Sequence, residues 1–237
     1  RTCSRTASTS RPISAIAYAQ NHRLLALSRH LSISSRGAVD SIQLICRRPI
    51  EELESVALTP QSATSVVLLK TLLRLRYGRE VDFVELRRPV EEQLTLSDAV
   101  LLIGDQGLEA MYFPLRGFRL YDLGTLWHEW TGLPMVYAVW AARVDFLRSR
   151  RNDILRVESI LRGAMDVSLT EEAALVQSAL GRYRFGRSCM TRYFRLLQYD
   201  FTPDFQAGLL RYYQLAHEAG ETPEVLDLRF LDEGDLA

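Results

Sequence analysis

Residues 121–143, YDLGTLWHEWTGLPMVYAVWAAR, carry the clearest statement of how this chain folds. The Trp and Leu spacing of the first half predicts an amphipathic helix, and MVYAV at the end predicts an apolar strand. Between them, Gly132 can take a positive φ, and Pro134 disfavours helix at Leu133. We therefore expect a helix that passes the chain to a buried strand through a fixed corner.

Strands and helices alternate ahead of this segment. Period-2 or all-apolar runs predict strands at residues 41–48, 56–59, 81–86 and 98–103. The loop 60–65 opens a helix that stops at Gly78. An all-apolar strand followed by a helix is typical of a parallel sheet, so we expect mostly parallel strands here.

The chain becomes helical after Arg143. Amphipathic spacing predicts helices over residues 144–162 and 192–199, and the capping box S-L-T-E predicts another that begins at Ser168. A last helix is predicted from Thr202, with Pro203 in its first turn, to Gly220.

Composition narrows the choice of partners. Lys plus Arg and Asp plus Glu both total 29, so no net charge attracts nucleic acid. Apolar runs fall short of the ~18 residues of a membrane span. The three cysteines are far apart and lack metal-ligand spacing, which fits a reducing cytosol and predicts no metal site. The sequence leaves monomer and homodimer equally open.

Sequence motifs of the common cofactor enzymes are missing. The chain has no G-x-S-x-G, H-E-x-x-H, Walker or dinucleotide glycine pattern. Serine hydrolase, zinc protease, NTPase and Rossmann functions therefore lose their main support, and we expect no cofactor.

The segment 121–143 resembles the D-L-G-x-x-W-x-x-x-T-G-L-P-[FM]-V-[FY]-A-V-W-A-A-R string of the chorismate dehydratases of the futalosine route to menaquinone. Three further segments resemble that family in the same order, LSISSRGAVDS (31–41), VALTPQSATSVVLL (56–69) and AVLLIGDQGL (99–108). The resemblance implies an α/β, two-lobe fold of the periplasmic binding protein type (type II), with mixed, mostly parallel sheets and flanking helices. Lobe 1 would hold residues 1–53 and 135–237, and lobe 2 residues 54–134.

The resemblance also implies a reaction. Members of the family are cytoplasmic hydro-lyases that remove water from chorismate to give 3-[(1-carboxyvinyl)oxy]benzoate. Because the product is aromatic, the substrate itself supplies much of the driving force. The protein then has to bind two carboxylates, hold the ring and exclude water.

Six residues are candidates for substrate binding. Ser62, Thr64 and Ser65 lie in a loop that opens a helix, where hydroxyls and N–H groups bind anions, although one hydroxyl could merely cap the helix. Gly104 and Asp105 end a buried strand, where α/β sheets bind ligands, although Asp105 is also a common turn residue. Ser41 matches a serine that the family places in its cleft.

Other conspicuous side chains favour structural roles. Trp127, Trp130 and Trp140 are expected to pack at the corner and between the lobes. His128 has no partner at metal-ligand spacing, so we expect a surface or half-buried histidine.

The first eleven residues have no hydrophobic periodicity, and we expect aberrant sequence there, with the family's first strand and helix missing. The family's catalytic asparagine, which follows that strand, has no match in this chain, so we expect no more than very weak turnover. A naphthoate synthase of the same pathway and a non-catalytic solute-binding protein remain as alternatives.

Overall fold

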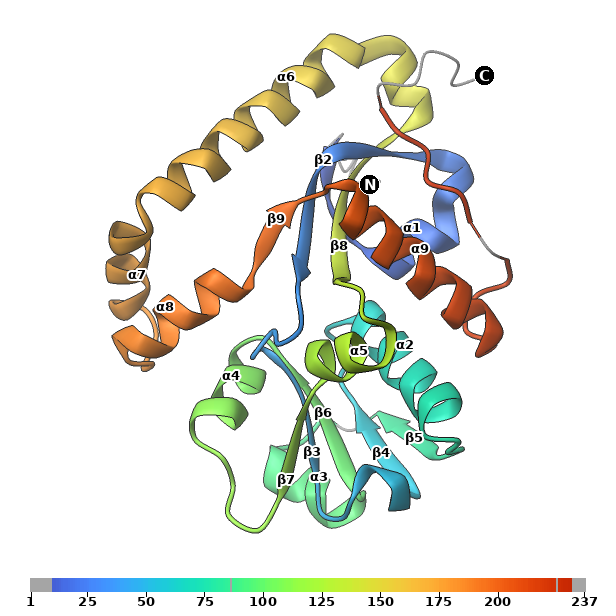
Figure 1. The fold of residues 1–237 in the computed structure, drawn as a ribbon, viewed down its shortest axis with the longest axis vertical. Coiled ribbons are helices and arrows are strands. Elements are labelled where there is room, and N and C mark those ends of the chain that lie inside the picture. The colour runs from blue at the N-terminus through green and yellow to red at the C-terminus, as the bar shows by residue number, and fades with distance from the viewer. Residues whose placement is uncertain (1–9, 86, 225, 232–237) are drawn as a thin grey trace, which may run out of the picture.

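The computed structural model describes residues 10–85, 87–224 and 226–231 and contains two β-sheets with flanking helices (Figure 1). The four-stranded sheet has the order β1-β8-β2-β9, and its neighbouring strands are antiparallel. These strands are β1 (Ser10–Ser14), β2 (Leu25–Ser35), β8 (Met135–Arg143) and β9 (Gln198–Asp200). This sheet and the helices on it form the upper lobe in Figure 1.

The five-stranded sheet has the order β5-β4-β6-β3-β7 and forms the lower lobe in Figure 1. Its strands are β3 (Ile42–Cys46), β4 (Ser55–Leu58), β5 (Asp82–Glu85), β6 (Ala99–Ile103) and β7 (Arg119–Asp122). Strand β4 is parallel to β5 and β6, whereas β3 is antiparallel to β6 and β7. The expectation of mostly parallel sheets is therefore wrong. Among the described strands, the parallel pairs are β4–β5 and β4–β6, which are connected through the helices α2 and α3 as parallel pairing requires.

The chain enters the lower lobe earlier than the sequence boundary at residue 54 implied. Strand β3 follows β2 after six residues and pairs with β6 and β7, not with the upper sheet. The sequence could not show this, because an alternating strand looks the same in either sheet. We therefore propose a lower lobe that begins within residues 36–41.

Nine α-helices are described in residues 10–85, 87–224 and 226–231: α1 (Ala15–Asn21), α2 (Ala63–Thr71), α3 (Val90–Leu96), α4 (Asp105–Tyr112), α5 (Leu123–Thr131), α6 (Val144–Thr170), α7 (Glu172–Leu180), α8 (Arg187–Leu196) and α9 (Pro203–Glu218). The predicted helix start at Ser168 is wrong, because α6 continues through it. The Ser168 hydroxyl donates to the Ala164 carbonyl at 2.8 Å, inside the last turns of α6. The predicted start at Thr202 is confirmed.

The corner between α5 and β8 is confirmed. Gly132 has a φ of 70° and ends α5, and β8 begins three residues later. The fully buried Trp127 donates from Nε1 to the Pro134 carbonyl at 3.1 Å, as expected of a packing residue. Helix α9 closes over the corner, because a Cβ added to Gly208 would lie 2.2 Å from the Pro134 carbonyl oxygen. His128 is exposed, as expected.

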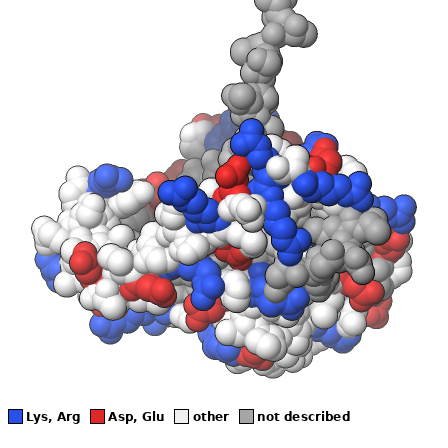
Figure 2. All heavy atoms as spheres, turned by 90° about the horizontal axis from the view of Figure 1, so that it is seen from above, with Lys and Arg blue, Asp and Glu red and all other residues white. Residues whose placement is uncertain are grey.

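The surface seen from above mixes basic and acidic side chains among uncharged ones (Figure 2). In the part of the chain that the structure describes, no helix combines the length and the apolar character needed to span a bilayer. The predicted aberrant segment lies mostly outside the described residues, although Ser10 and Arg11 belong to β1.

Candidate functional site

A cavity of about 490 Å³ lies between the two sheets and is walled by three parts of the chain. The upper sheet contributes the ends or middles of β1, β2 and β8, and the lower lobe contributes the residues just before β3, α2 and α4. Helix α8 and β9 close the third side. The lining residues are Pro12, Ile13, Ser14, Ile33, Val39, Ser41, Ile42, Gln61, Ser62, Ala63, Ile103, Gly104, Tyr137, Ala138, Tyr193, Leu197 and Tyr199.

Three of the six predicted binding residues, Ser41, Ser62 and Gly104, line this cavity. Ser62 and Gly104 are the N-cap residues of α2 and α4, which follow the neighbouring parallel strands β4 and β6. The Gly104 N–H donates to the Ser41 carbonyl at 2.9 Å, which brings Ser41 to the same edge of the sheet. The lower wall of the cavity is thus the carboxyl edge of β4 and β6, where α/β folds bind ligands.

The other three predicted binding residues do not line the cavity. Thr64 is buried beside α1, where its Oγ1 accepts from the Ile16 N–H at 3.2 Å. Ser65 is also buried, and its Oγ accepts from the Ser62 hydroxyl at 2.8 Å. Asp105 is exposed and lines an adjacent pocket of about 230 Å³ between α4 and the α7–α8 pair. The sequence did not predict that these three side chains lie outside the cavity, because it does not show which side of a helix faces the cleft.

Sequence reasoning missed the tyrosines of the cavity, because they lie in three separate elements and form no motif. Tyr137 is on β8, and its hydroxyl lies 3.0 Å from Ser35 Oγ. Tyr193 is on α8, and Tyr199 is on β9. Burial raises the pKa of all three phenols above the ordinary value, so that each stays protonated at neutral pH and can donate a hydrogen bond.

Among the described residues that line the cavity, none has a charged side chain. Its polar groups are serine and tyrosine hydroxyls, the Gln61 amide, and the N–H groups in the first turns of α2 and α4. First-turn N–H groups have no partner within their own helix, and the helix dipole favours negative charge there. The cavity therefore offers hydrogen-bond donors to an anion without an opposing carboxylate.

Two aspartates, the buried Asp40 and the partly buried Asp122, fix the segment that carries Ser41. Asp122 accepts from the N–H groups of Val39 and Asp40, at 3.1 and 2.7 Å, and from Gln43 Nε2 at 2.8 Å. Burial raises the pKa of Asp122, and the backbone N–H groups oppose that shift. Asp40 has a φ of 58° and binds Arg192 and Tyr112 through its carboxylate. Hydrogen bonds to both aspartates thus fix the segment that connects β2 to β3.

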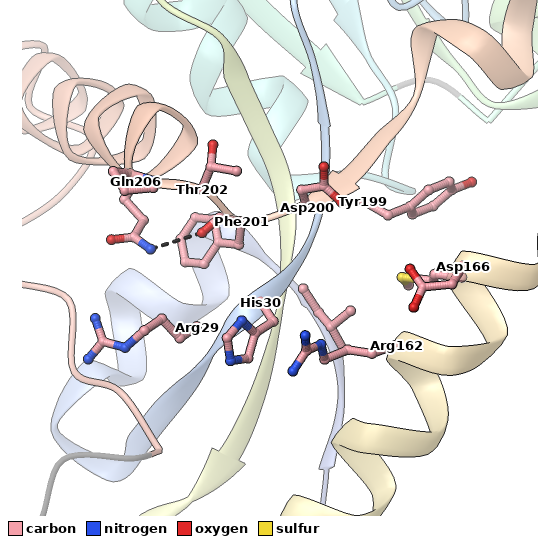
Figure 3. Close-up of a pocket in the computed structure, with 12 residues that line it drawn as sticks. Arg29, His30, Arg162, Asp166, Tyr199, Asp200, Phe201, Thr202 and Gln206 are labelled. Atoms are coloured by element: carbon pink, nitrogen blue, oxygen red, sulfur yellow. Dashed lines mark hydrogen bonds between the residues drawn. The ribbon is translucent and has the colours of Figure 1, made fainter. Parts of the chain in front are cut away.

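A second cavity, of about 420 Å³, lies where α6 passes β2 and β9 (Figure 3). Figure 3 shows Arg162 and His30 pointing toward its middle, with Asp166 and Asp200 on other sides. None of the six predicted binding residues lines it. Since it combines arginines with carboxylates, it is less suited than the first cavity to a dianion.

The described part of the chain holds no group of three or more His, Cys, Asp or Glu side chains that could bind a metal ion. Cys46 is buried in β3, and Cys189 is partly exposed on α8.

The sequence matches the protein family described as "Menaquinone biosynthesis" over residues 9–218. It is 36% identical over 150 residues to the chorismate dehydratase of Thermus thermophilus, a match that covers 55% of this chain and 53% of that protein. The chain thus spans about half the length of this curated relative.

Solved structures share the fold. Protein AF1704 from Archaeoglobus fulgidus is 22% identical with a TM-score of 0.65, over 90% of this chain and 79% of that chain. The CA3427 gene product of Candida albicans, which has the generic periplasmic binding protein fold, is 11% identical. Its TM-score is 0.66, over 97% of this chain and 82% of that chain. These likenesses confirm the predicted two-lobe α/β fold.

Proposed function

Because this chain belongs to the menaquinone biosynthesis family, we propose that its cleft binds chorismate and removes water from it to give 3-[(1-carboxyvinyl)oxy]benzoate. One observation carries the proposal: the cavity at the carboxyl edge of β4 and β6 has many hydrogen-bond donors and, in the described residues, no charged side chain. This environment suits a small dicarboxylate. We place the reaction in the cytoplasm, in the futalosine pathway.

One carboxylate of chorismate binds at the start of α2. Ser62 Oγ accepts from the Ser65 N–H at 3.2 Å, which fixes the first turn of the helix. The remaining first-turn N–H groups and the Gln61 amide are then available to an anion at this end of the cavity. Ser62 therefore caps helix α2 and also shapes the anion site, so that a capping role and a binding role for this loop are compatible.

The second carboxylate binds at the start of α4. Gly104 has a φ of 63° and a ψ of −132°, a backbone conformation that favours glycine. The turn brings the chain from β6 into α4 beside Ser41, and a Cβ on Gly107 would lie 2.3 Å from the Ser41 carbonyl oxygen. The N-terminus of α4 and the Ser41 hydroxyl thus form one compact donor group.

Apolar side chains cover the rest of the cavity. Ile13 and Ile33 come from the upper sheet, and Val39, Ile42 and Ile103 come from the lower lobe. They can enclose the ring of chorismate and keep water away, which strengthens the hydrogen bonds to its carboxylates. The ring loses a proton and its hydroxyl group, as water, and becomes aromatic. The protein's part is to hold the carboxylates and the ring while this happens.

The test is incubation of the protein with chorismate, with loss of the diene absorbance and formation of the aromatic product followed together. We expect saturable 1:1 binding and formation of the aromatic product. Binding with no product would favour the alternative of a solute-binding protein, whose fold this chain shares. Absence of binding would overturn the proposal.

A matched pair of variants locates the binding. Gln61→Glu adds a negative charge to the cavity at nearly constant volume. Two like charges ~4 Å apart repel by ~4 kcal/mol at an effective dielectric constant of ~20 and by ~1 kcal/mol in water. Because Gln61 is exposed, the repulsion lies between these limits, and we expect chorismate affinity to fall about tenfold. Gln214→Glu makes the same change at an exposed position on α9 and should leave the affinity unchanged.

A further inference from the structure

An ion pair joins two segments that are 152 residues apart in the sequence, beside the cleft. Arg192 Nε donates to Asp40 Oδ2 at 2.8 Å, and Arg192 Nη2 donates to Asp40 Oδ1 at 3.1 Å. Tyr112 also donates to Oδ2, at 2.6 Å. The Asp40 side chain is 1% exposed, so this two-pronged contact fixes α8 against the β2–β3 crossing.

Each partner of the ion pair is followed by a residue that lines the cleft. Ser41 follows Asp40, and Tyr193 follows Arg192. Both side chains line the same cavity, so the ion pair fixes the backbone directly beside two of its hydroxyl groups. Each hydroxyl carries one proton that it can donate to a ligand.

Helix α8 belongs to an arm formed by the helices α6, α7 and α8, which connects β8 to β9. The arm leaves β8 as α6, reaches the lower lobe at α7 and α8, and returns to the upper sheet as β9 (Figure 1). Its contact with the lower lobe has an apolar centre, where Leu108 of α4 packs among Val176, Phe185 and Met190, and an exposed ion pair at 2.9 Å between Arg184 and Glu109. The buried pair of Asp40 and Arg192 is a second polar contact, and it lies one residue from Tyr193. It therefore fixes the part of α8 that lines the cleft.

We propose that Asp40 and Arg192 are positioning residues that hold the Ser41 and Tyr193 hydroxyls as one donor pair, and that this pair binds a carboxylate oxygen of the substrate. The proposal rests on the proposed function, because it assigns a further contact to the carboxylate at the start of α4. Tyr193 lines the same cavity as Ser41 and Gly104, which are hydrogen-bonded neighbours at the start of α4. Burial keeps the Tyr193 phenol protonated at neutral pH, as a donor requires.

The first test is Tyr193→Phe, with chorismate affinity measured by calorimetric titration. Loss of one hydrogen bond to a charged group is expected to lower the affinity about tenfold or more. Tyr183→Phe is the control, because Tyr183 is exposed, lies in the adjacent pocket and does not line the cleft. Equal affinity of Tyr193→Phe and the wild type would overturn the proposal.

The second test separates positioning from plain stability. Asp40→Asn keeps a residue that tolerates positive φ and removes the charge, and Arg192→Gln removes the other partner. Arg192→Gln is expected to weaken chorismate binding several-fold in the wild type and to have little further effect once Tyr193 is phenylalanine. Asp40→Asn should lose only part of its effect in that background, because Asp40 also holds Ser41. A merely structural role predicts the same loss in both backgrounds, and that result would contradict the positioning role.

Arg195→Gln is the matched control for Arg192→Gln. Arg195 lies on the same helix and forms a two-pronged pair with Glu172, with both distances at 2.8 Å, but it does not line the cleft. It should change binding by less than twofold. A wild type that fails to bind chorismate would overturn the proposed function and this proposal together. A wild type that binds, with no effect of Tyr193→Phe, would overturn this proposal alone.

Discussion

Replacing Gly107 with alanine places a methyl group where α4 touches the β2–β3 crossing. The added Cβ would lie 2.3 Å from the Ser41 carbonyl oxygen, 2.6 Å from its carbonyl carbon and 3.2 Å from its Cα. Real Cβ atoms essentially never approach another atom within 3.0 Å. Helix α4 and Ser41 must therefore separate by at least 0.7 Å, and the obstructing atoms are backbone, which cannot rotate away as a side chain could.

The size of the effect follows from two opposed terms. Overpacking of this kind costs ~1–3 kcal/mol, and alanine recovers ~0.5–1 kcal/mol relative to glycine inside a helix. We expect a net loss of ~1–2 kcal/mol, which lowers the melting temperature by ~2–8 °C in a protein of this size. Chorismate affinity should also fall, since the shift separates Ser41 from the first turn of α4.

Gly163→Ala is the control for the same substitution in open space. Gly163 lies in α6, and a Cβ added there would have no atom within 4 Å. This variant should be as stable as the wild type or more stable by up to ~1 kcal/mol, with unchanged binding. Thermal unfolding measures the stability of both variants, and calorimetric titration measures their affinity for chorismate. Equal stability of Gly107→Ala and Gly163→Ala would refute the close contact on which the geometry of the α4 site depends.

Three further predictions concern the core. Trp127→Ala should lower the free energy of unfolding by ~3–5 kcal/mol in denaturant titrations, because this side chain is fully buried at the corner; a loss below ~1 kcal/mol would contradict that packing. Tyr212→Phe should cost about 1 kcal/mol in the same measurement, because its hydroxyl donates to the Thr64 carbonyl at 3.1 Å. Burial raises the pKa of the Cys46 thiol to about 12, against ~8.5 in an unfolded chain. In a Cys3→Ser, Cys189→Ser background, a disulfide reagent at pH 8 should therefore label Cys46 only after denaturation. Rapid labelling of the folded protein would contradict the burial of Cys46. For the same reason the free energy of unfolding should fall as the pH rises above ~8.5, because the unfolded chain then loses a proton that the folded chain keeps.

Local chemistry made part of the fold predictable. The corner at Gly132 follows from glycine and proline, and the last helix follows from Thr202 and Pro203. Strand β2 could not be predicted, because its buried serines conceal the alternation of a strand. Ser32 shows why they are tolerated, since its hydroxyl donates to the Asp200 carbonyl of β9 at 2.6 Å. Such partners lie far away in the sequence.

The same limit applies to the site. Ser41, Ser62 and Gly104 line the cavity because each lies next to a strand or at the start of the helix that follows one, at one edge of a sheet, which the sequence does reveal. Thr64 is turned toward α1 by the rotation of its helix, and no local pattern indicates that direction. Tyr193 reaches the cleft through an arm whose position depends on the Asp40–Arg192 pair, a contact that only the folded chain brings together.

We propose that the cleft binds chorismate through the donors at the starts of α2 and α4. Calorimetric titration of the protein with chorismate tests it most directly, with the Gln61→Glu and Gln214→Glu variants alongside. We expect one chorismate per chain, about tenfold weaker binding in Gln61→Glu, and unchanged binding in Gln214→Glu. The absence of saturable binding, or equal affinities in the two variants, would contradict it.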